Sequence, residues 1–275
     1  MGESLSTWTP SCNGAVRVEL SGQRTTSDSG ALLLREALDN SGVIEALEDN
    51  LVDRRHPLRI LHSLASQLRT LVLQRAMGWI DLSDTDTLRR DPLWQLACSD
   101  ARGMTPLVQD RPSQATLSRL LTCLGRCDNI DAVHEGLLRL VIWRLTALKN
   151  GERPKQLTLD IDGLPIEVHG HQGGSAYHGL YGARIYSPLV ASLAETGDMV
   201  GGLLREGNAG PAENADTWIP HLVRRLNEST GAQVRVRIDA GFTDNATLEA
   251  LEECDIEYLG RLRSHSGLQK LAAPH

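Results

Sequence analysis

The sequence predicts an α/β protein that has a helical first part and a mixed β-sheet in its second part. Two observations carry this prediction. The apolar residues recur with a helical period up to residue 149, and from residue 157 they alternate with polar residues as in strands. The polar segment 150–155 (NGERPK) interrupts both patterns. We therefore expect two domains, 1–155 and 156–275, each long enough to bury a core of its own.

Besides the helix at Ser113 described below, four helices are expected in the first part. An apolar run predicts a helix over 29–38 that ends at the breaker sequence Asn-Ser-Gly, and a short apolar run follows at 43–51. A longer helix is expected from Pro57 to Gly78, because proline favours the first helical turn and leucines then recur on one stripe. The last helix is expected over 131–149.

The second part begins with a strand, because the apolar residues of 157–161 alternate with Thr158, Asp160 and Asp162. Further elements follow in the order strand, strand, helix, strand, helix, strand, and they are expected over 178–194, 199–206, 215–227, 234–239, 244–253 and 258–263. A turn at 195–198 would join the second and third strands. This order predicts an α/β layer whose first strands are antiparallel.

Charge and cysteine content narrow the class of protein. Residues 1–155 carry as many basic as acidic side chains, so the whole formal net charge of -7 lies in 156–275. The five cysteines are scattered without a paired spacing, which argues against a disulfide framework or a structural zinc site. No stretch reaches the ~18 apolar residues of a membrane span, and the first residues do not resemble a secretory signal. A cytoplasmic protein without a membrane partner is expected.

Two strands each bring aspartate to a polar face. Asp160 and Asp162 lie on the first strand, and Asp239 ends the strand at 234–239. Clustered carboxylates raise one another's pKa, and a divalent cation is the usual remedy. Oxygen ligands suit Mg²⁺ or Mn²⁺, and two such ions support phosphodiester cleavage by activating water and stabilising the leaving oxygen. The alternative is that these aspartates are only solubilising residues on a solvent-exposed face of the sheet.

A helix that begins at Ser113, with the sequence SQATLSRL, is typical of the recognition helix of a helix-turn-helix motif. Its candidate DNA contacts are Arg119, Ser113, Gln114 and Thr116. An ordinary capped amphipathic helix would show the same pattern. Arg54 and Arg55 are further candidates for contact with backbone phosphate, although such charge pairs are commonly just solvated.

Three other patterns resemble catalytic or metal-binding motifs. The sequence LDIDGL matches the opening motif of haloacid-dehalogenase-type phosphatases, but the only lysine after it is Lys270, so we do not adopt that interpretation. His169, His171 and His178 lack cysteine or carboxylate partners at ligand spacing and are interpreted as loop residues. Cys123 and Cys127 would lie on one helix face as buried thiols.

An ordered set of segments in the sequence resembles a known family. In the second part these are LDIDGLPIEVHGHQGG, YHGLYGARIYSPLV, LREGN and RIDAGF, and in the first part TTSDSGALLLREAL, DRRHPLRILHSLASQLRTLVLQRAMGW, DLSDTDTLRRDPLWQLA and SQATLSRL. Together they resemble bacterial insertion-sequence transposases with a DDE group-1 domain. The resemblance implies a DNA-binding helical part, an RNase H-like core, divalent metal, and cleavage and strand transfer of double-stranded DNA by an oligomer assembled at element ends.

The resemblance also implies roles for particular residues. Asp239 in RIDAGF matches the second catalytic carboxylate. Asp162 is preferred as the first, but the family's D-x-T pattern is replaced here by Asp-Gly-Leu, which leaves Asp160 as an alternative. The third, a glutamate on a later helix, has no match, because Glu249, Glu252 and Glu253 come too early. We therefore expect an incomplete RNase H-like domain in a truncated chain, or else a non-catalytic remnant that only binds DNA.

Overall fold

The computed structural model describes the chain except for residues 1–25, 27, 101–110, 149–153, 264–265 and 268–275. By internal contacts the chain divides into two compact units, 1–40 with 53–125 and 41–52 with 126–275. The division therefore falls between Gly125 and Arg126, whereas the sequence pattern predicts it near residue 155. The last helix before the sheet packs within the second unit, against a strand and a helix that follow it in sequence. In the described ranges no helix is long and apolar enough to cross a membrane.

The first unit is helical, as predicted. Its elements are α1 (Gly30–Ser41), η1 (Pro57–Arg59), α3 (Leu64–Ala76), η2 (Leu82–Asp84), α4 (Thr85–Leu88), α5 (Pro92–Ala97) and α6 (Gln114–Leu124). The single helix expected from Pro57 to Gly78 is wrong. Pro57 opens only a 3₁₀ turn, and α3 begins after Ser63, whose hydroxyl accepts a hydrogen bond from the Ser66 amide at 2.9 Å. Leu58 and Leu61 are 92% and 87% exposed, so the buried stripe starts only inside α3.

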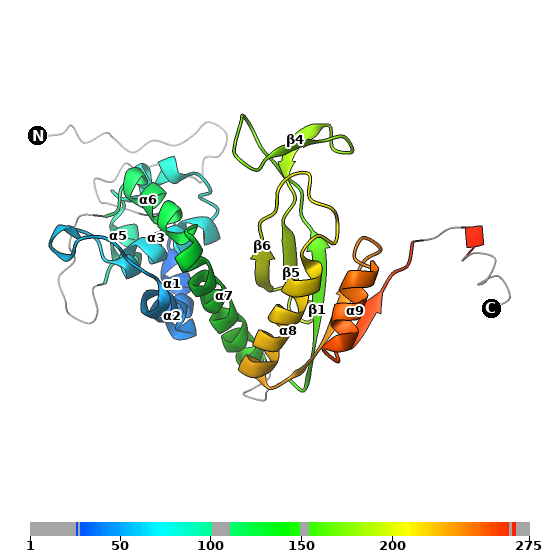
Figure 1. Cartoon of the computed structure of the whole chain (residues 1–275). Helices are drawn as coiled ribbons and strands as arrows, with labels where there is room; N and C mark the ends of the chain where they lie inside the picture. Colours follow the sequence, from blue (N-terminus) through cyan, green and yellow to red (C-terminus); the bar gives the residue numbers. More distant parts are fainter. Residues whose placement is uncertain (1–25, 27, 101–110, 149–153, 264–265, 268–275) are drawn as a thin grey trace, which may run out of the picture. The chain divides into compact units, whose positions relative to one another are not determined.

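The second unit is α/β and contains a mixed sheet, again as predicted (Figure 1). Its elements are α2 (Val43–Asn50), α7 (Cys127–Leu148), β1 (Gln156–Gly163), β2 (Ile166–Glu167), β3 (Ala176–His178), β4 (Ala183–Tyr186), β5 (Leu189–Leu193), β6 (Met199–Leu203), α8 (Ala215–Thr230), β7 (Gln233–Ile238), α9 (Asn245–Glu253) and β8 (Tyr258–Gly260). The five-stranded sheet has the order β6-β5-β1-β7-β8. β1 is antiparallel to β5 and parallel to β7.

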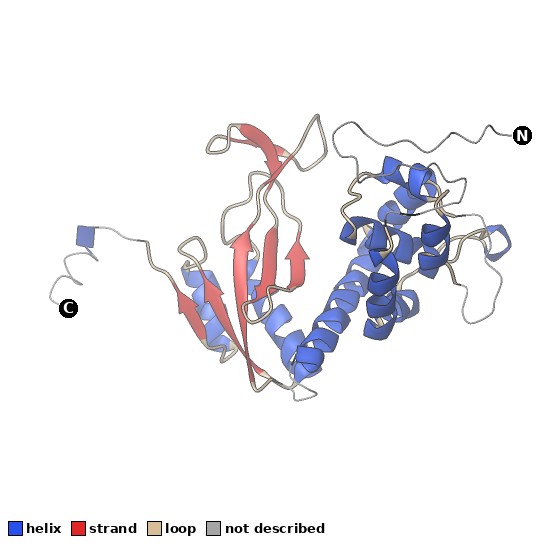
Figure 2. Cartoon of the chain, turned by 180° about the vertical axis from the view of Figure 1, so that it is seen from behind, coloured by secondary structure: helices blue, strands red, loops and turns tan. Residues whose placement is uncertain are grey.

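The core of this unit lies on one face of the five-stranded sheet. Alternate side chains of β1, β5 and β7 are buried there against α7, α8 and α9. A β-carbon at Gly201 would lie 2.9 Å from Leu222 Cδ2, so only glycine lets α8 pack this closely on β6. Seen from behind in Figure 2, the strands of the five-stranded sheet lie in front of α8 and α9, and no described helix of the second unit covers that face. The opposite face is therefore available for polar side chains.

The strand expected over 178–194 is wrong, because the chain turns twice within that range. The amides of Tyr181 and Gly182 both donate to the carbonyl of His178, which closes a turn, and Gly182 has a φ of 64°. Proline at 188, before β5, marks the second change of direction. The segment therefore supplies the end of β3, then β4, then β5. β2, β4 and β3 form a separate three-stranded sheet.

Candidate functional site

The pairing of β1 with β7 brings two of the predicted aspartates to neighbouring positions. The parallel register runs from Gln156 opposite Gln233 to Ile161 opposite Ile238, so the next residues along the two strands are Asp162 and Asp239. Adjacent strands lie ~4.8 Å apart, and successive side chains alternate between the sheet faces. Since Ile161 and Ile238 point into the core, the two aspartates belong to the face without helices.

A hollow of about 590 Å³ lies at this place, at the carboxyl ends of β1, β7 and β8. Its lining comprises Asp160, Ile161, Asp162, Arg237, Ile238, Asp239, Leu259, Gly260 and Arg261. Ligands of open α/β sheets commonly bind outside the carboxyl ends of strands. All three predicted carboxylates therefore border one open surface.

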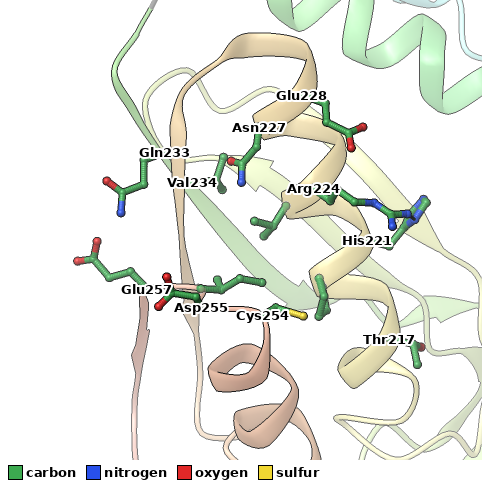
Figure 3. Close-up of a pocket in the computed structure, with 13 residues that line it drawn as sticks. Thr217, His221, Arg224, Asn227, Glu228, Gln233, Val234, Cys254, Asp255 and Glu257 are labelled. Atoms are coloured by element: carbon green, nitrogen blue, oxygen red, sulfur yellow. Dashed lines mark hydrogen bonds between the residues drawn. The ribbon is translucent and has the colours of Figure 1, made fainter.

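A slightly larger hollow, of about 660 Å³, lies between α8, the start of β7 and the turn that follows α9 (Figure 3). Of its acidic side chains, Glu228 lies on α8, and Asp255 and Glu257 lie in the connection between α9 and β8. It is at the opposite end of β7 from Asp239. The volume of a hollow does not by itself indicate a reaction, so we place the candidate site at the hollow that is lined by the three aspartates.

Both exposed aspartates are fixed by backbone amides. Asp162 Oδ1 accepts from the Gly163 amide at 2.7 Å, and Asp239 Oδ1 accepts from the Gly241 amide at 2.8 Å. A β-carbon at Gly241 would lie 3.0 Å from Asp239 Oδ1 and 3.2 Å from Pro211 Cβ, so a side chain at this position would crowd the carboxylate. The Oδ2 atoms have no hydrogen-bond partner in the described ranges. Each carboxylate thus presents an oxygen that can bind a cation.

Asp160 is in a different environment, although it shares the sheet face. Its Oδ2 forms an ion pair with Arg237 Nη2 at 2.5 Å, and this hydrogen bond raises the pKa of the Arg237 guanidinium above its ordinary value. Asp160 Oδ1 is buried and has no hydrogen-bond partner. The charge of Asp160 is therefore balanced within the sheet, whereas Asp162 and Asp239 have no cationic partner in the ion pairs of the described residues.

The donor atoms suit a hard divalent cation but do not complete a site for one. Two aspartate oxygens with water are ligands that Mg²⁺ and Mn²⁺ accept. Within the described residues no group of three or more His, Cys, Asp or Glu side chains is placed to hold a metal. Glu249, Glu252 and Glu253 lie on α9 outside the hollow, and Glu252 accepts a hydrogen bond from Tyr258.

The predicted DNA contacts on α6 lie at the start of a helix in the first unit. Ser113 is the N-cap, and its hydroxyl is engaged by the amide of Thr116 at 3.4 Å and by the Thr116 hydroxyl at 3.1 Å. Gln114 and Arg119 are exposed. α5 ends at Ala97, so residues 98–113 separate these helices and α6 does not follow α5 through a tight turn.

The arginine pair of the first unit is also exposed, in the segment before η1. Arg55 binds Asp53 through its Nη2 at 2.7 Å and the carbonyl of His62 through its Nη1 at 2.9 Å. Arg55 therefore fixes its own loop, and a phosphate would have to share the guanidinium with Asp53. Arg54 is exposed beside it.

The weaker candidates do not form metal sites in the described part of the chain. His169 and His171 are exposed, and the ring of His178 packs against Tyr181 with centroids 5.0 Å apart. The prediction for the cysteines is wrong. Cys123 lies in α6 and Cys127 starts α7, so they do not share a helix face, and Cys127 is exposed.

Sequence reasoning missed Arg205, which is only 6% exposed. Its Nε donates to the carbonyl of Ser187 at 2.7 Å, and its Nη1 donates to the carbonyls of Gly210, Pro211 and Glu213 at 2.9, 3.0 and 2.8 Å. Arg205 thereby holds the loop before α8, and Pro211 of that loop lies 3.2 Å from where a β-carbon would stand at Gly241, the residue whose amide binds Asp239. The sequence signal for this residue was the segment LREGN, in which Arg205 lies; this segment is part of the family resemblance, but the resemblance gave Arg205 no role.

The family model for the transposase DDE domain group 1 matches residues 9–275. Among solved structures, a match is the cryo-EM structure of a piggyBac transposase synaptic complex with hairpin DNA, at 13% identity and a TM-score of 0.36. That alignment covers 88% of this chain and 52% of the other, so the chain spans about half the length of that protein. No curated protein matches. Since the family model covers nearly the whole chain, this protein belongs to the transposase DDE domain group 1 family.

Proposed function

We propose that the protein is the transposase of a bacterial insertion sequence, which binds the element ends and cleaves and joins DNA with the help of Mg²⁺ or Mn²⁺. The observation that carries the proposal is the β1–β7 register, which puts Asp162 beside Asp239 in an open hollow. Transposases of the DDE family generally use divalent metal ions. Bound ions would activate the attacking water or hydroxyl and stabilise the leaving oxygen.

In this proposal Asp162 and Asp239 are the metal ligands and Asp160 is not. The backbone amides of Gly163 and Gly241 orient the two ligands and leave one oxygen of each for the cation. The ion pair between Asp160 and Arg237 argues against Asp160, because a cation would have to compete with a guanidinium for that carboxylate. Asp160 then serves to hold Arg237 on the open sheet face.

DNA is the proposed partner of both parts of the chain. Exposed Arg119, together with Gln114, supplies side chains at the start and on the next turn of α6 that reach phosphates or base edges. Residues 1–155 would bind the double-stranded element ends, and the aspartate hollow in the second part would receive the scissile phosphate. A homo-oligomer assembled on DNA is part of the proposal.

A second candidate function is DNA binding without catalysis. It is favoured by one observation, that the third carboxylate among the described residues of the hollow, Asp160, is already paired with Arg237. A second metal ion would lack a ligand to fix its position, and misplacing a reacting group by ~1 Å can cost a hundredfold in rate.

One experiment separates these functions. DNA fragments from the two flanks of the gene are labelled and incubated with the protein, with and without Mn²⁺, beside Asp162→Ala and Asp239→Ala variants. The transposase proposal expects preferential binding of the flanks and cleavage that needs Mn²⁺ and both aspartates. Binding without any cleavage supports the non-catalytic candidate. No preference for the flanks, or cleavage that survives both substitutions, contradicts the proposal.

A further inference from the structure

The three-stranded sheet β2-β4-β3 contains an unusual share of the aromatic side chains. Tyr177 and Tyr186 lie in its strands and Tyr181 in the turn between β3 and β4, and the whole chain has only four tyrosines. In the registers, Ile166 pairs with Tyr186 and Tyr177 pairs with Arg184. Because residues two apart in a strand share a face, Ile166, Tyr177, Arg184 and Tyr186 form one row across the sheet. We call this row the tyrosine platform.

Tyr177 and Ile166 of the platform are exposed, whereas Tyr186 and Arg184 are half-buried and held by hydrogen bonds. Tyr177 is 65% and Ile166 45% exposed, whereas Ile185, which points to the opposite face, is 2% exposed. The Tyr186 hydroxyl donates to the carbonyl of Gly173 at 2.5 Å. Arg184 donates from Nη2 to the Ser175 carbonyl at 2.5 Å and from Nε to the Ser175 hydroxyl at 3.3 Å. Its Nη1 has no partner in the described ranges, so the guanidinium can still bind a further acceptor.

The platform is tied to the aspartate hollow through short connections. β2 begins at Ile166, four residues after Asp162, and the amide of Leu164 donates to the carbonyl of Pro188 just before β5. Four residues of fully extended chain span at most ~14 Å. The rise along one DNA strand is ~3.4 Å per nucleotide. The edge of the platform at Ile166 therefore lies within about four nucleotides of a phosphate bound at Asp162.

The chemistry of the platform fits nucleic-acid bases. Aromatic rings and arginine guanidinium planes on an exposed sheet stack on unpaired bases without regard to sequence. Within β2, β3 and β4 no carboxylate belongs to this face, because Glu167 alternates to the other side. Exposed large apolar side chains that lie together mark a contact surface.

We propose that the tyrosine platform binds unstacked bases of single-stranded DNA next to the phosphate that the aspartate hollow receives. The platform deepens the proposed function and rests on it. It gives the second part of the chain a DNA contact of its own, which depends on stacking and not on its negative net charge. The contact is sequence-tolerant and lies beside the reacting phosphate.

The first test measures the binding of the full chain to a fluorescein-labelled single-stranded oligothymidylate of about 20 nucleotides, long enough to exceed one binding site. No metal is added, so the assay does not depend on cleavage. Tyr177→Ala should weaken binding about fivefold or more, the loss expected for one stacked base. Tyr177→Phe keeps the ring and should bind like the unsubstituted protein. Met199→Ala removes a side chain of 46% exposure from β6 and is the matched control.

A second test locates the contact. An oligonucleotide that carries 5-iododeoxyuridine is photo-crosslinked to the protein, and the crosslinked peptide should contain Tyr177 or Tyr186. The inference is overturned if Tyr177→Ala binds the oligonucleotide as the unsubstituted protein does, or if the full chain does not bind it. It is also overturned if Tyr177→Ala lowers the molar mass measured by light scattering and leaves DNA affinity intact, since the platform would then join two copies of the chain. The flank-cleavage experiment can fail independently of each of these outcomes.

Discussion

Replacing Arg205 with alanine tests whether the loop before α8 is held by one buried guanidinium. Arg205 donates to four carbonyls, those of Ser187, Gly210, Pro211 and Glu213. Its burial lowers the pKa of the guanidinium below its ordinary value, and hydrogen bonds compensate the lost hydration. Alanine removes all of these donors at once.

The magnitude follows from the number of bonds. Hydrogen bonds to a charged group contribute about 1.5–3 kcal/mol each, but they are not additive and water replaces part of them. Gly210, Pro211 and Glu213 belong to exposed positions, so water reaches their carbonyls once the side chain is gone. We therefore expect a loss of about 3 kcal/mol. For a unit of this size, that corresponds to a fall in Tm of about 6–12 °C.

The assay is differential scanning calorimetry of the full chain, with hydrogen exchange of residues 205–213 as a local readout. Arg205→Lys should recover less than half of the loss, because an ammonium cannot match the planar fork that faces these carbonyls. Arg224→Ala, on the exposed side of α8, is the control and should stay within about 0.5 kcal/mol. A fall of less than about 2 °C for Arg205→Ala, with unchanged exchange in 205–213, would refute this reasoning.

Other predictions concern DNA, pH, packing and catalysis. Arg119→Ala should weaken binding to the gene's flanks, and in a salt titration it should reduce the slope of log affinity against log salt concentration by about one phosphate contact. Arg75→Ala, which is also exposed in the first unit, should do neither. Burial lowers the pKa of His134 below 6.5, so the unfolded chain binds more protons than the folded chain just below that pH. The free energy of unfolding, measured with urea, should therefore fall as the pH drops through 6.5. His134→Gln should make this fall smaller. Gly201→Val should lower Tm by several degrees, because its side chain meets Leu222. Mn²⁺-dependent cleavage of labelled flanks should be weak, because Asp160, the third carboxylate of the hollow, is paired with Arg237, and robust cleavage would show that a further carboxylate completes the site.

The alternation of apolar and polar residues was enough to predict β1 and β7 and the face on which their aspartates lie. It could not give the register between strands that are distant in sequence, and this register puts Asp162 rather than Asp160 beside Asp239. The pairing of Asp160 with Arg237 depends on the same register.

The failed predictions have local physical causes. The leucine stripe was extended across Ser63, although a serine before an apolar run is a strong N-cap signal. The strand expected over 178–194 contains the turn sequence Gly-Leu-Tyr-Gly and a proline, and each of these interrupts a strand. Arg205 could not be assigned from sequence, because its partners are backbone carbonyls and leave no side-chain pattern.

The pairing of Asp162 with Asp239 is tested most directly by Mn²⁺ binding to the full chain, measured by isothermal titration calorimetry without DNA. We predict a Mn²⁺ site that is lost in Asp162→Asn and in Asp239→Asn, because each removes one of the two carboxylates that present a free oxygen to the hollow. Asp160→Asn should weaken the site far less, since that carboxylate is already bound to Arg237. Loss of the site in Asp160→Asn with retention in Asp162→Asn, or binding that is unchanged in all three variants, would contradict the account.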